Sequence, residues 1–270
     1  MYFVGLTFSD QIDINSNKPQ YMISIITVCW NNLCGLKATH DSIRAQSFRD
    51  YEWIVIDGGS SDGTVEYLKN IARPDFYVSE TDNGIYDAMN KGFSYVRGDL
   101  IIYLNSGDVF LEPSSLGGAV DLILTMKSKA DVFLFDYALK LPNGFNINKS
   151  ARTIDEYIWH GMPTNHQSIL FSRDVIRCFP YDLSYKICGD YYLLARIFNS
   201  NYKVMNINAT LCTFEVGGTS FQKPWALIKE SYMVKVNILE LSWSVRLTSL
   251  LKSVFSIYGL KLLSLKWIRY

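Results

Sequence analysis

The chain has few of the residues that build metal clusters and disulfide frameworks. Its 270 residues contain three histidines with no HxH or HExxH spacing, and five cysteines with no CxxC. A structural zinc site therefore has little to build on. The odd number of cysteines, three of them within apolar runs, is typical of free thiols in a reducing compartment, so we expect a cytoplasmic protein.

Long apolar runs and net charge are absent too. No uninterrupted apolar stretch reaches about 18 residues, which predicts that no helix crosses a membrane. Residues 1–20 lack the basic and apolar regions of a signal peptide. Basic and acidic side chains number 26 each, so no overall field attracts nucleic acid. The 49% hydrophobic and 19% charged residues indicate an ordinary globular protein with one large domain and an appendage.

The even charge balance hides a basic C-terminal end. Residues 227–270 carry seven basic and two acidic side chains, a net charge of +5, which leaves −5 on the rest of the chain. Over residues 245–258, apolar residues recur at steps of three and four, while Arg246 and Ser249 lie on the other side. This spacing predicts an amphipathic helix. We expect a helical tail at 227–270 that contacts a membrane surface; the alternative is a core helix packed on the domain.

The rest of the chain alternates between apolar, β-rich segments and helical patterns. Strands are predicted at residues 22–29, 52–57, 75–79, 100–104 and 131–137. Helices are predicted at about 33–46, 63–72, 84–97 and 115–128. Short buried strands separated by helices indicate an α/β fold with a mostly parallel sheet flanked by helices. Beyond residue 150, we expect HQSILFS, YKVMNIN and LCTFEV as strands, with a helix at about 189–199.

Polar side chains gather where the predicted strands end. These ends read VCWNN, VIDGGSSDG, VSETDNG and YLNSGD. Ligands of open α/β sheets bind beyond the carboxyl ends of the strands, which predicts a binding crevice here. We expect Asp57 to contact the ligand, with Gly58 and Gly59 allowing close approach of the backbone. Asp62 is expected to cap the next helix.

Four further positions leave alternatives open. Lys91 either pairs with Asp87, four residues earlier on the same helical face, or contacts a phosphate. Asp108 is either a turn residue or one of the few carboxylates that a phosphate-bound Mg²⁺ needs. Asp190, at a helix start, is either a cap or a general base that takes a proton from a hydroxyl. His166, a lone histidine ahead of a strand, is either structural or part of the site.

Taken together, six segments resemble the family 2 glycosyltransferases, most closely their bacterial colanic-acid and O-antigen type members. In chain order and at family-like spacing, they are ISIITVCWNN, EWIVIDGGSSDGT, SETDNGIYDAMNKG, IIYLNSGD, NHQSILF and YKICGDYYLLAR. The match spans residues 22–220, and DNGIYDAMNKG is its most specific part. The resemblance implies a GT-A fold with a nucleotide-sugar half at 22–130 and an acceptor half at 131–226. Residues 1–21, polar and without periodicity, are expected to be a non-essential extension.

The resemblance also implies roles for individual residues. Asp190 matches the catalytic base, and Asp108 matches the last carboxylate of a D-x-D segment that holds Mg²⁺ or Mn²⁺. The chain departs from the family at two positions: Ser106 replaces the first carboxylate of that segment, and Gly189 replaces a glutamate before the base. The residues expected to bind the nucleotide sugar are Thr27, Val28, Asn31, Asp57, Asp82, Asn83, Gly84, Asp87, Lys91, Ser106, His166, Gly217 and Gly218.

The function implied is inverting transfer of a hexose from a nucleotide-diphosphate sugar to a saccharide hydroxyl. The acceptor would be linked to a polyprenyl diphosphate at the inner membrane, in synthesis of a surface polysaccharide such as O-antigen, colanic acid or capsule. A sugar nucleotidyltransferase is the first alternative, but it needs a glycine-rich loop with Arg or Lys after the first strand, which CWNNLCGLKATH does not supply. A non-catalytic nucleotide-sugar-binding subunit is the second, and it could dispense with Asp108 and Asp190, which are both present.

Overall fold

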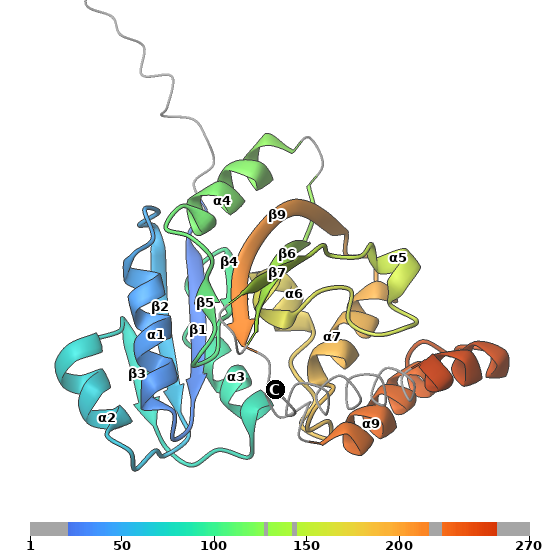
Figure 1. Ribbon diagram of the computed structural model, residues 1–270, viewed down its shortest axis with the longest axis horizontal. Helices are drawn as coiled ribbons and strands as arrows, with labels where there is room; N and C mark the ends of the chain where they lie inside the picture. The colour runs from blue at the N-terminus through green and yellow to red at the C-terminus, as the bar shows by residue number, and fades with distance from the viewer. Residues whose placement is uncertain (1–20, 127–128, 142–144, 216–222, 253–270) are drawn as a thin grey trace, which may run out of the picture.

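The computed structural model describes residues 21–126, 129–141, 145–215 and 223–252. One sheet runs through the molecule in the order β3-β2-β1-β4-β8-β6-β9-β5, with β7 paired to β6 (Figure 1). The strands are β1 (Ile23–Cys29), β2 (Tyr51–Asp57), β3 (Phe76–Ser79), β4 (Leu100–Tyr103), β5 (Val109–Phe110), β6 (Val132–Lys140), β7 (Asn146–Lys149), β8 (Ile169–Ser172) and β9 (Val204–Glu215). The helices are α1 (Leu33–Arg44), α2 (Thr64–Tyr67), η1 (Leu68–Ala72), α3 (Ile85–Phe93), α4 (Ser115–Thr125), α5 (Ile154–Tyr157), η2 (His166–Ser168), α6 (Arg173–Cys178), α7 (Gly189–Phe198) and α9 (Pro224–Asn237).

The first half of the sheet is parallel because helices connect its strands. β1 pairs in parallel with β2 and β4, and β2 pairs in parallel with β3. All seven residues of β1 are buried, and alternate side chains enter opposite layers. Ile26 joins the layer that includes α3, α6 and α7, whereas Ile25 joins the layer of α1 and α4. The prediction of an α/β fold with parallel, helix-flanked strands is confirmed.

The second half of the sheet mixes strand directions. β8 pairs antiparallel with β4 and with β6, and β6 pairs parallel with β9. β9 is one strand of 12 residues, which joins two segments predicted as separate strands. A register shift on either side of Asp136 lets β6 follow the curved β9 (Figure 1). The elements β5, β7, α5 and α6 have two to six residues each and were not predicted.

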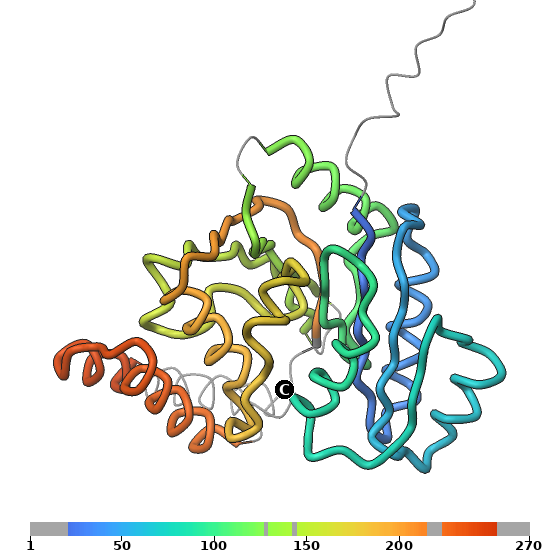
Figure 2. Tube along the Cα trace, turned by 180° about the vertical axis from the view of Figure 1, so that it is seen from behind, coloured from blue at the N-terminus to red at the C-terminus, as the bar shows by residue number. Residues whose placement is uncertain are grey.

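The C-terminal helices lie on the side of the molecule away from β3 and α2 (Figures 1 and 2). α9 packs beside α7, and the chain is helical again at 243–252. In this helix Ser249 is 1% exposed, while Leu247 and Leu251 are 37% and 49% exposed.

Two predicted segments fall partly or wholly outside the described residues. These are the N-terminal extension, apart from Tyr21, and the part of the tail at 253–270. Within the described part of the chain, no helix has both the length and the apolar character needed to cross a membrane.

Candidate active site

Asp57 ends β2 at the carboxyl edge of the sheet, and three donors hold its carboxylate. The backbone N–H of Ser60 donates over 3.0 Å, and the hydroxyls of Ser60 and Ser79 donate over 2.5 Å each. The Asp57 side chain is fully buried. These donors use three of the about four acceptor sites that a carboxylate offers. Asp57 therefore organises the turns after β2 and β3 as well as lying where a ligand was predicted.

Two asparagines tie the loop after β1 to the loops after β2 and β4. The side chain of Asn31 accepts the Ser61 N–H over 2.8 Å, and its backbone N–H donates to the Ser60 hydroxyl over 2.7 Å. Asn32 caps α1, and its amide donates to the carbonyl and hydroxyl of Ser106 over 3.0 and 3.2 Å. The three loops thus form one hydrogen-bonded rim, with Asn31 and Ser106 on it as predicted.

Trp30 is a rim residue that the sequence analysis missed. Its side chain is 70% exposed. A Cβ atom on Gly58 would lie 3.3 Å from this ring and 2.9 Å from the Asp82 carboxylate, so the three residues are neighbours. An exposed aromatic face beside glycine backbone can stack on a planar ligand group. The signal was the tryptophan in VCWNN, but only the fold shows that it faces solvent.

The segment SETDNGIYDAMNKG caps its own helix, α3. Asp82 accepts the Gly84 N–H over 3.0 Å, and Asp87 accepts the Asn83 N–H over 2.8 Å. Gly84 has a φ of 115°, a conformation that glycine adopts without steric cost. These four predicted site residues therefore lie together at the N-terminus of α3.

Lys91 is held by acidic neighbours. Its ammonium lies 2.9 Å from Glu80 and 3.6 Å from Asp87, and it donates to the Thr81 carbonyl over 3.2 Å. The hydrogen bond with Glu80 raises the pKa of Lys91. The predicted pairing with Asp87 is present, and a phosphate would have to compete with Glu80 for this cation.

The segment after β4 brings Asp108 close to His166. Gln167 donates to Asp108 over 3.2 Å, and the amide nitrogen of Asn105 lies 2.8 Å from His166 Nε2. His166 Nδ1 lies 3.6 Å from an oxygen of Asp190. Burial raises the pKa of Asp108 to about 6, although His166 and the hydrogen bonds work against this shift. Two carboxylates from distant segments are therefore contacted by two consecutive residues, Asp108 by Gln167 and Asp190 by His166.

Asp190 is the second residue of α7, and two tyrosines surround it. Tyr181 donates to Asp190 over 2.9 Å, while the Tyr86 hydroxyl lies 3.4 Å away. The two rings stack with centroids 5.0 Å apart. A Cβ on Gly189 would lie 2.6 Å from the Tyr86 ring, so a glutamate at this position would displace that ring. Sequence analysis missed both tyrosines, because nothing in their spacing links them to Asp190.

Two further predicted residues, Thr27 and Val28, do not present side chains to the rim. The Thr27 hydroxyl is fully buried, donates to the Leu104 carbonyl over 2.8 Å and accepts the Trp53 indole N–H over 2.9 Å. Its side chain therefore supports β1 from within the core and is not placed to hold a nucleotide. Val28 is buried, and its carbonyl accepts the Ser106 N–H over 3.1 Å. Gly217 and Gly218 lie outside the described residues.

Asp62 differs from its predicted role as a helix cap. Gly63 is the N-cap of α2, and Asp62 accepts the Thr64 N–H and hydroxyl from one position earlier, over 3.2 and 2.6 Å. Its second oxygen accepts the Leu33 N–H over 2.8 Å. Asp62 therefore stabilises the starts of two helices, α1 and α2.

Asp108 is where a divalent cation would fit best. Across the described ranges, no group of three or more histidine, cysteine, aspartate or glutamate side chains comes together as a metal cluster. A carboxylate whose pKa is raised by burial is stabilised by a nearby cation. Mg²⁺ needs only one or two protein carboxylates when phosphate oxygens supply other ligands. The residues fit a cation shared with a diphosphate, not a closed protein cage.

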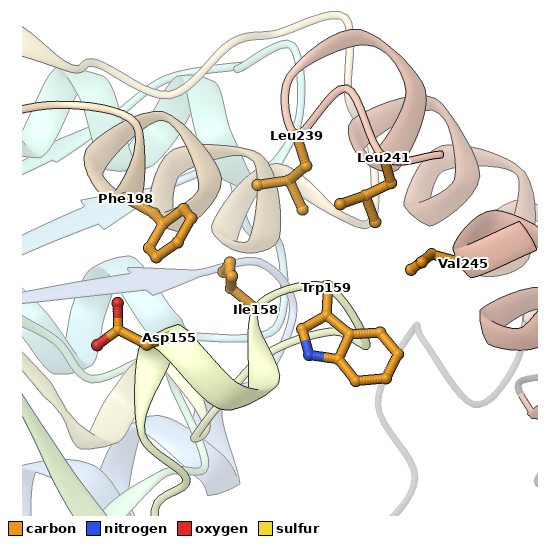
Figure 3. A pocket seen from close by; sticks show the side chains of 7 residues that line it. All are labelled: Asp155, Ile158, Trp159, Phe198, Leu239, Leu241 and Val245. Carbon is orange, nitrogen blue, oxygen red and sulfur yellow. The ribbon is translucent and has the colours of Figure 1, made fainter. Parts of the chain in front are cut away.

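An apolar groove of about 350 Å³ lies away from this rim, at the other end of α7. Figure 3 shows C-terminal side chains facing residues from α5 and α7 across it. The lining residues are Asp155, Ile158, Trp159, Phe198, Leu239, Leu241 and Val245. Phe198 is eight residues from Asp190 on the same helix, which corresponds to about 12 Å along its axis.

Comparison with known proteins places this geometry in a family. The model of glycosyl transferase family 2 matches residues 24–181, more than half of the chain. The chain belongs to glycosyl transferase family 2. An uncharacterised glycosyltransferase of Mycobacterium tuberculosis is 32% identical over 217 residues, which cover 76% of this chain and 79% of the relative.

Solved structures share the fold of this family 2 glycosyltransferase. The crystal structure of Staphylococcus aureus TarS 1–349 in complex with UDP has a TM-score of 0.63 at 16% identity, covering 86% of this chain and 70% of that one. The mannosyltransferase PcManGT from Pyrobaculum calidifontis, in complex with GDP-Man and Mn²⁺, has a TM-score of 0.63 at 13% identity, with coverages of 89% and 76%. The predicted GT-A fold is confirmed.

Proposed function

We propose that this glycosyltransferase transfers a hexose from a nucleotide-diphosphate sugar to a saccharide hydroxyl with inversion at the anomeric carbon. The observation that carries the proposal is that two consecutive residues, Gln167 and His166, contact Asp108 and Asp190 respectively. This arrangement brings a carboxylate suited to a cation and a carboxylate suited to a base to one region of the sheet.

Asp190 is the proposed general base. In a direct displacement, its carboxylate takes the proton of the acceptor hydroxyl while that oxygen bonds to the anomeric carbon. The bond from this carbon to the diphosphate oxygen breaks in the same step, and the nucleoside diphosphate leaves with the electron pair. Tyr181 and His166 restrict the carboxylate to one orientation.

The donor is proposed to lie along the rim. Trp30, Asn31 and Asp57 would contact the nucleoside, and the residues from Asp82 to Asp87 would line the sugar diphosphate. Asp108, beside Ser106, would hold Mg²⁺ or Mn²⁺, and such an ion neutralises charge on a departing diphosphate. PcManGT, which was solved with GDP-Man and Mn²⁺, supports this part of the proposal by its fold.

The proposed acceptor is a saccharide on a polyprenyl diphosphate, met at the inner membrane during surface-polysaccharide synthesis. α9 exposes Trp225, Tyr232 and Met233 together with Lys229, and Trp243 is exposed farther along. Aromatic and basic side chains of this kind favour the surface of an anionic membrane. The apolar groove lies beside these helices (Figure 3), and a polyprenyl chain in it would lie at the end of α7 opposite to Asp190.

A donor screen tests the proposal. The protein is incubated with a panel of nucleotide-diphosphate sugars and a saccharide acceptor, and release of nucleoside diphosphate and the anomeric configuration of the product are measured. In Asp190→Asn, turnover should fall by at least about 10²-fold with donor affinity nearly intact, because the amide keeps the shape and loses the basicity. Asp174→Asn, an exposed aspartate on α6, is the control. Donor binding without transfer would favour the non-catalytic subunit, and a retained anomeric configuration would contradict inversion.

A further inference from the structure

The backbone just before the proposed base carries three N–H groups that converge on one carboxylate. The N–H groups of Lys186, Ile187 and Cys188 donate to Glu230 over 3.0, 2.8 and 2.8 Å. Cys188 is the N-cap residue of α7, and its own side chain does not cap the helix. Converging N–H groups favour an anion, and the half-buried Glu230 supplies it.

Glu230 comes from α9, which contacts both ends of α7. Near the start of α7, the Cys188 thiol lies 3.5 Å from the Leu227 carbonyl. After its end, the Asn199 amide donates to the Ile238 carbonyl over 2.6 Å. Glu230 is the only acidic residue of α9, and it faces the domain, while Trp225 and Lys229 of the same helix are exposed. α9 is therefore fixed relative to the base-bearing helix.

The same segment is held from its other side by α3. The side-chain amide of Asn90 exchanges two hydrogen bonds with the backbone of Tyr181, over 2.8 and 2.9 Å. The Tyr86 hydroxyl donates to the Ile187 carbonyl over 2.8 Å. Residues 181–188 are thus clamped between α3 and α9, and the proposed base follows two residues after the last clamped N–H.

We propose that Glu230 is a positioning residue, which holds the segment that carries Asp190 and makes α9 part of the catalytic unit. The inference rests on Asp190 being the base of the proposed function. Without the Glu230 carboxylate, three N–H groups lose their acceptor, and the segment is free to move away from the acceptor hydroxyl. The hydrogen bonds described for Glu230 all go to residues 186–188, and none of them goes to the donor rim. The predicted boundary between residues 226 and 227 would fall inside this unit.

Steady-state kinetics of the full chain provide the first test. In Glu230→Ala, kcat should fall by about 10- to 100-fold, because a small displacement of a catalytic group costs this much. The donor KM should stay within about twofold, since no hydrogen bond described for Glu230 goes to the donor rim. Glu230→Gln keeps one acceptor oxygen and should lie between this variant and the wild type. Glu240→Ala removes the same charge from an exposed side chain of the same C-terminal region and should behave as wild type.

Hydrogen exchange separates this inference from the proposed function, because it needs no turnover. The amides of residues 186–188 should exchange at least about tenfold faster in Glu230→Ala than in wild type or Glu240→Ala, with the β1 amides unchanged. If the wild type transfers no sugar, the proposed function fails while exchange still tests the clamp. Unchanged exchange overturns the inference, as does faster exchange with wild-type kcat. Parallel losses of kcat, donor affinity and thermal stability would indicate general destabilisation and would overturn it too.

Discussion

Tyr181 and Tyr103 are neighbouring buried tyrosines that differ in what their hydroxyls reach. Tyr181 donates to Asp190 over 2.9 Å, nearer than the Tyr86 hydroxyl. Burial raises the pKa of Tyr181 well above its ordinary value, so the phenol stays protonated and donates. The Tyr103 ring lies 5.3 Å from the Tyr181 ring, yet its hydroxyl has no hydrogen-bond partner within the described residues. Replacing each tyrosine with phenylalanine therefore compares the loss of a hydroxyl that contacts the proposed base with the loss of a hydroxyl that does not.

Tyr181→Phe should lower kcat by about tenfold, since a hydrogen bond to a charged group contributes about 1.5–3 kcal/mol and some of it is lost in orienting the base. Donor KM should stay within about twofold. Tyr103→Phe removes a buried hydroxyl without a described partner and should leave kcat near wild type. Both are measured with the donor found in the screen. Equal kcat in the two variants would show that the Tyr181 hydroxyl does not act on Asp190.

Asp108→Ala should weaken nucleoside diphosphate binding and abolish its dependence on metal, because cation and diphosphate share one site in the proposal. Titration calorimetry with UDP and GDP, with Mn²⁺ or with EDTA, measures both effects. In wild type, Mn²⁺ should tighten the binding of the nucleoside diphosphate by at least about tenfold, because the positive charge of the ion offsets the repulsion between the phosphates and the carboxylates. Asp121→Ala, an exposed change on α4, is the control. Full wild-type activity in EDTA would mean that side chains neutralise the leaving group instead.

Glu52 joins three elements at the amino end of the sheet. From β2, it accepts the Ser24 hydroxyl of β1 over 2.5 Å, and the backbone N–H and Nε of Arg97 over 2.6 and 2.7 Å. A Cβ on Gly98 would lie 2.6 Å from the Ser24 hydroxyl, so the turn after α3 needs glycine here. Burial acts to raise the pKa of Glu52, but these hydrogen bonds outweigh it and the pKa is lowered.

The lowered pKa of Glu52 sets the sign of its effect on stability. An ionised group with a depressed folded-state pKa stabilises above its unfolded pKa, about 4.3 for glutamate, and loses that contribution as the pH falls through the folded value. Glu52→Gln should therefore lower the free energy of unfolding at pH 7 by about 2 kcal/mol and flatten its fall below about pH 4. Urea unfolding at several pH values measures this. Glu66→Gln, an exposed change on α2, should leave the curve unchanged; an identical curve for Glu52→Gln would refute the prediction.

Elements with continuous apolar runs could be predicted, and short paired ones could not. β1, β2 and β4 are buried on both faces, and their sequences are mainly apolar. β5 has two residues, too few for a recognisable pattern, and it is a strand because it pairs with β9. β7 is exposed throughout, so no alternation marks it. Here tertiary pairing, not local pattern, decides the structure.

The same division holds within the site. Asp57, Asp82 and Asp108 lie at or after the carboxyl ends of strands. Because these ends meet at one edge of the sheet, the sequence predicted that the three residues group there. Tyr86 and Glu230 reach the base-bearing segment from about 100 and 40 positions away along the chain. No short motif encodes such distances, and only packing brings these side chains together.

In the whole molecule, α7 lies between α3, which begins at the donor rim, and the C-terminal helix α9 (Figure 1). The N-terminal end of α7 carries Asp190, and its C-terminal end carries Phe198 of the apolar groove. α9 fixes the first end through Glu230, while its other face is exposed and aromatic. A membrane on that face and a donor on the rim would thus meet at one helix.

Removing residues 245–270 should release the protein from anionic vesicles and leave transfer to a water-soluble acceptor within about threefold. The segment holds five basic residues and no acidic one, and each basic residue contributes roughly 1 kcal/mol near an anionic surface. Leu247 and Leu251, which are exposed, are lost with it. α9 and its Glu230 contacts remain, so the base-bearing segment keeps its support. Removing residues 224–270 takes away that glutamate as well, and transfer should then fall together with vesicle binding.

Co-sedimentation with phosphatidylglycerol vesicles, set against phosphatidylcholine vesicles and a soluble-acceptor assay, measures both truncations. Equal sedimentation of the full chain and of the chain lacking 245–270 would contradict the anchor. Aggregation of that truncated form would have a different meaning. Val245 lines the apolar groove opposite Ile158 and Trp159 (Figure 3), so loss of solubility would show that the C-terminal segment covers this groove and packs on the domain. If the truncated protein is released from the vesicles and stays soluble, the apolar groove is stable when it is exposed to water. A binding site that a lipid chain enters and leaves needs this property.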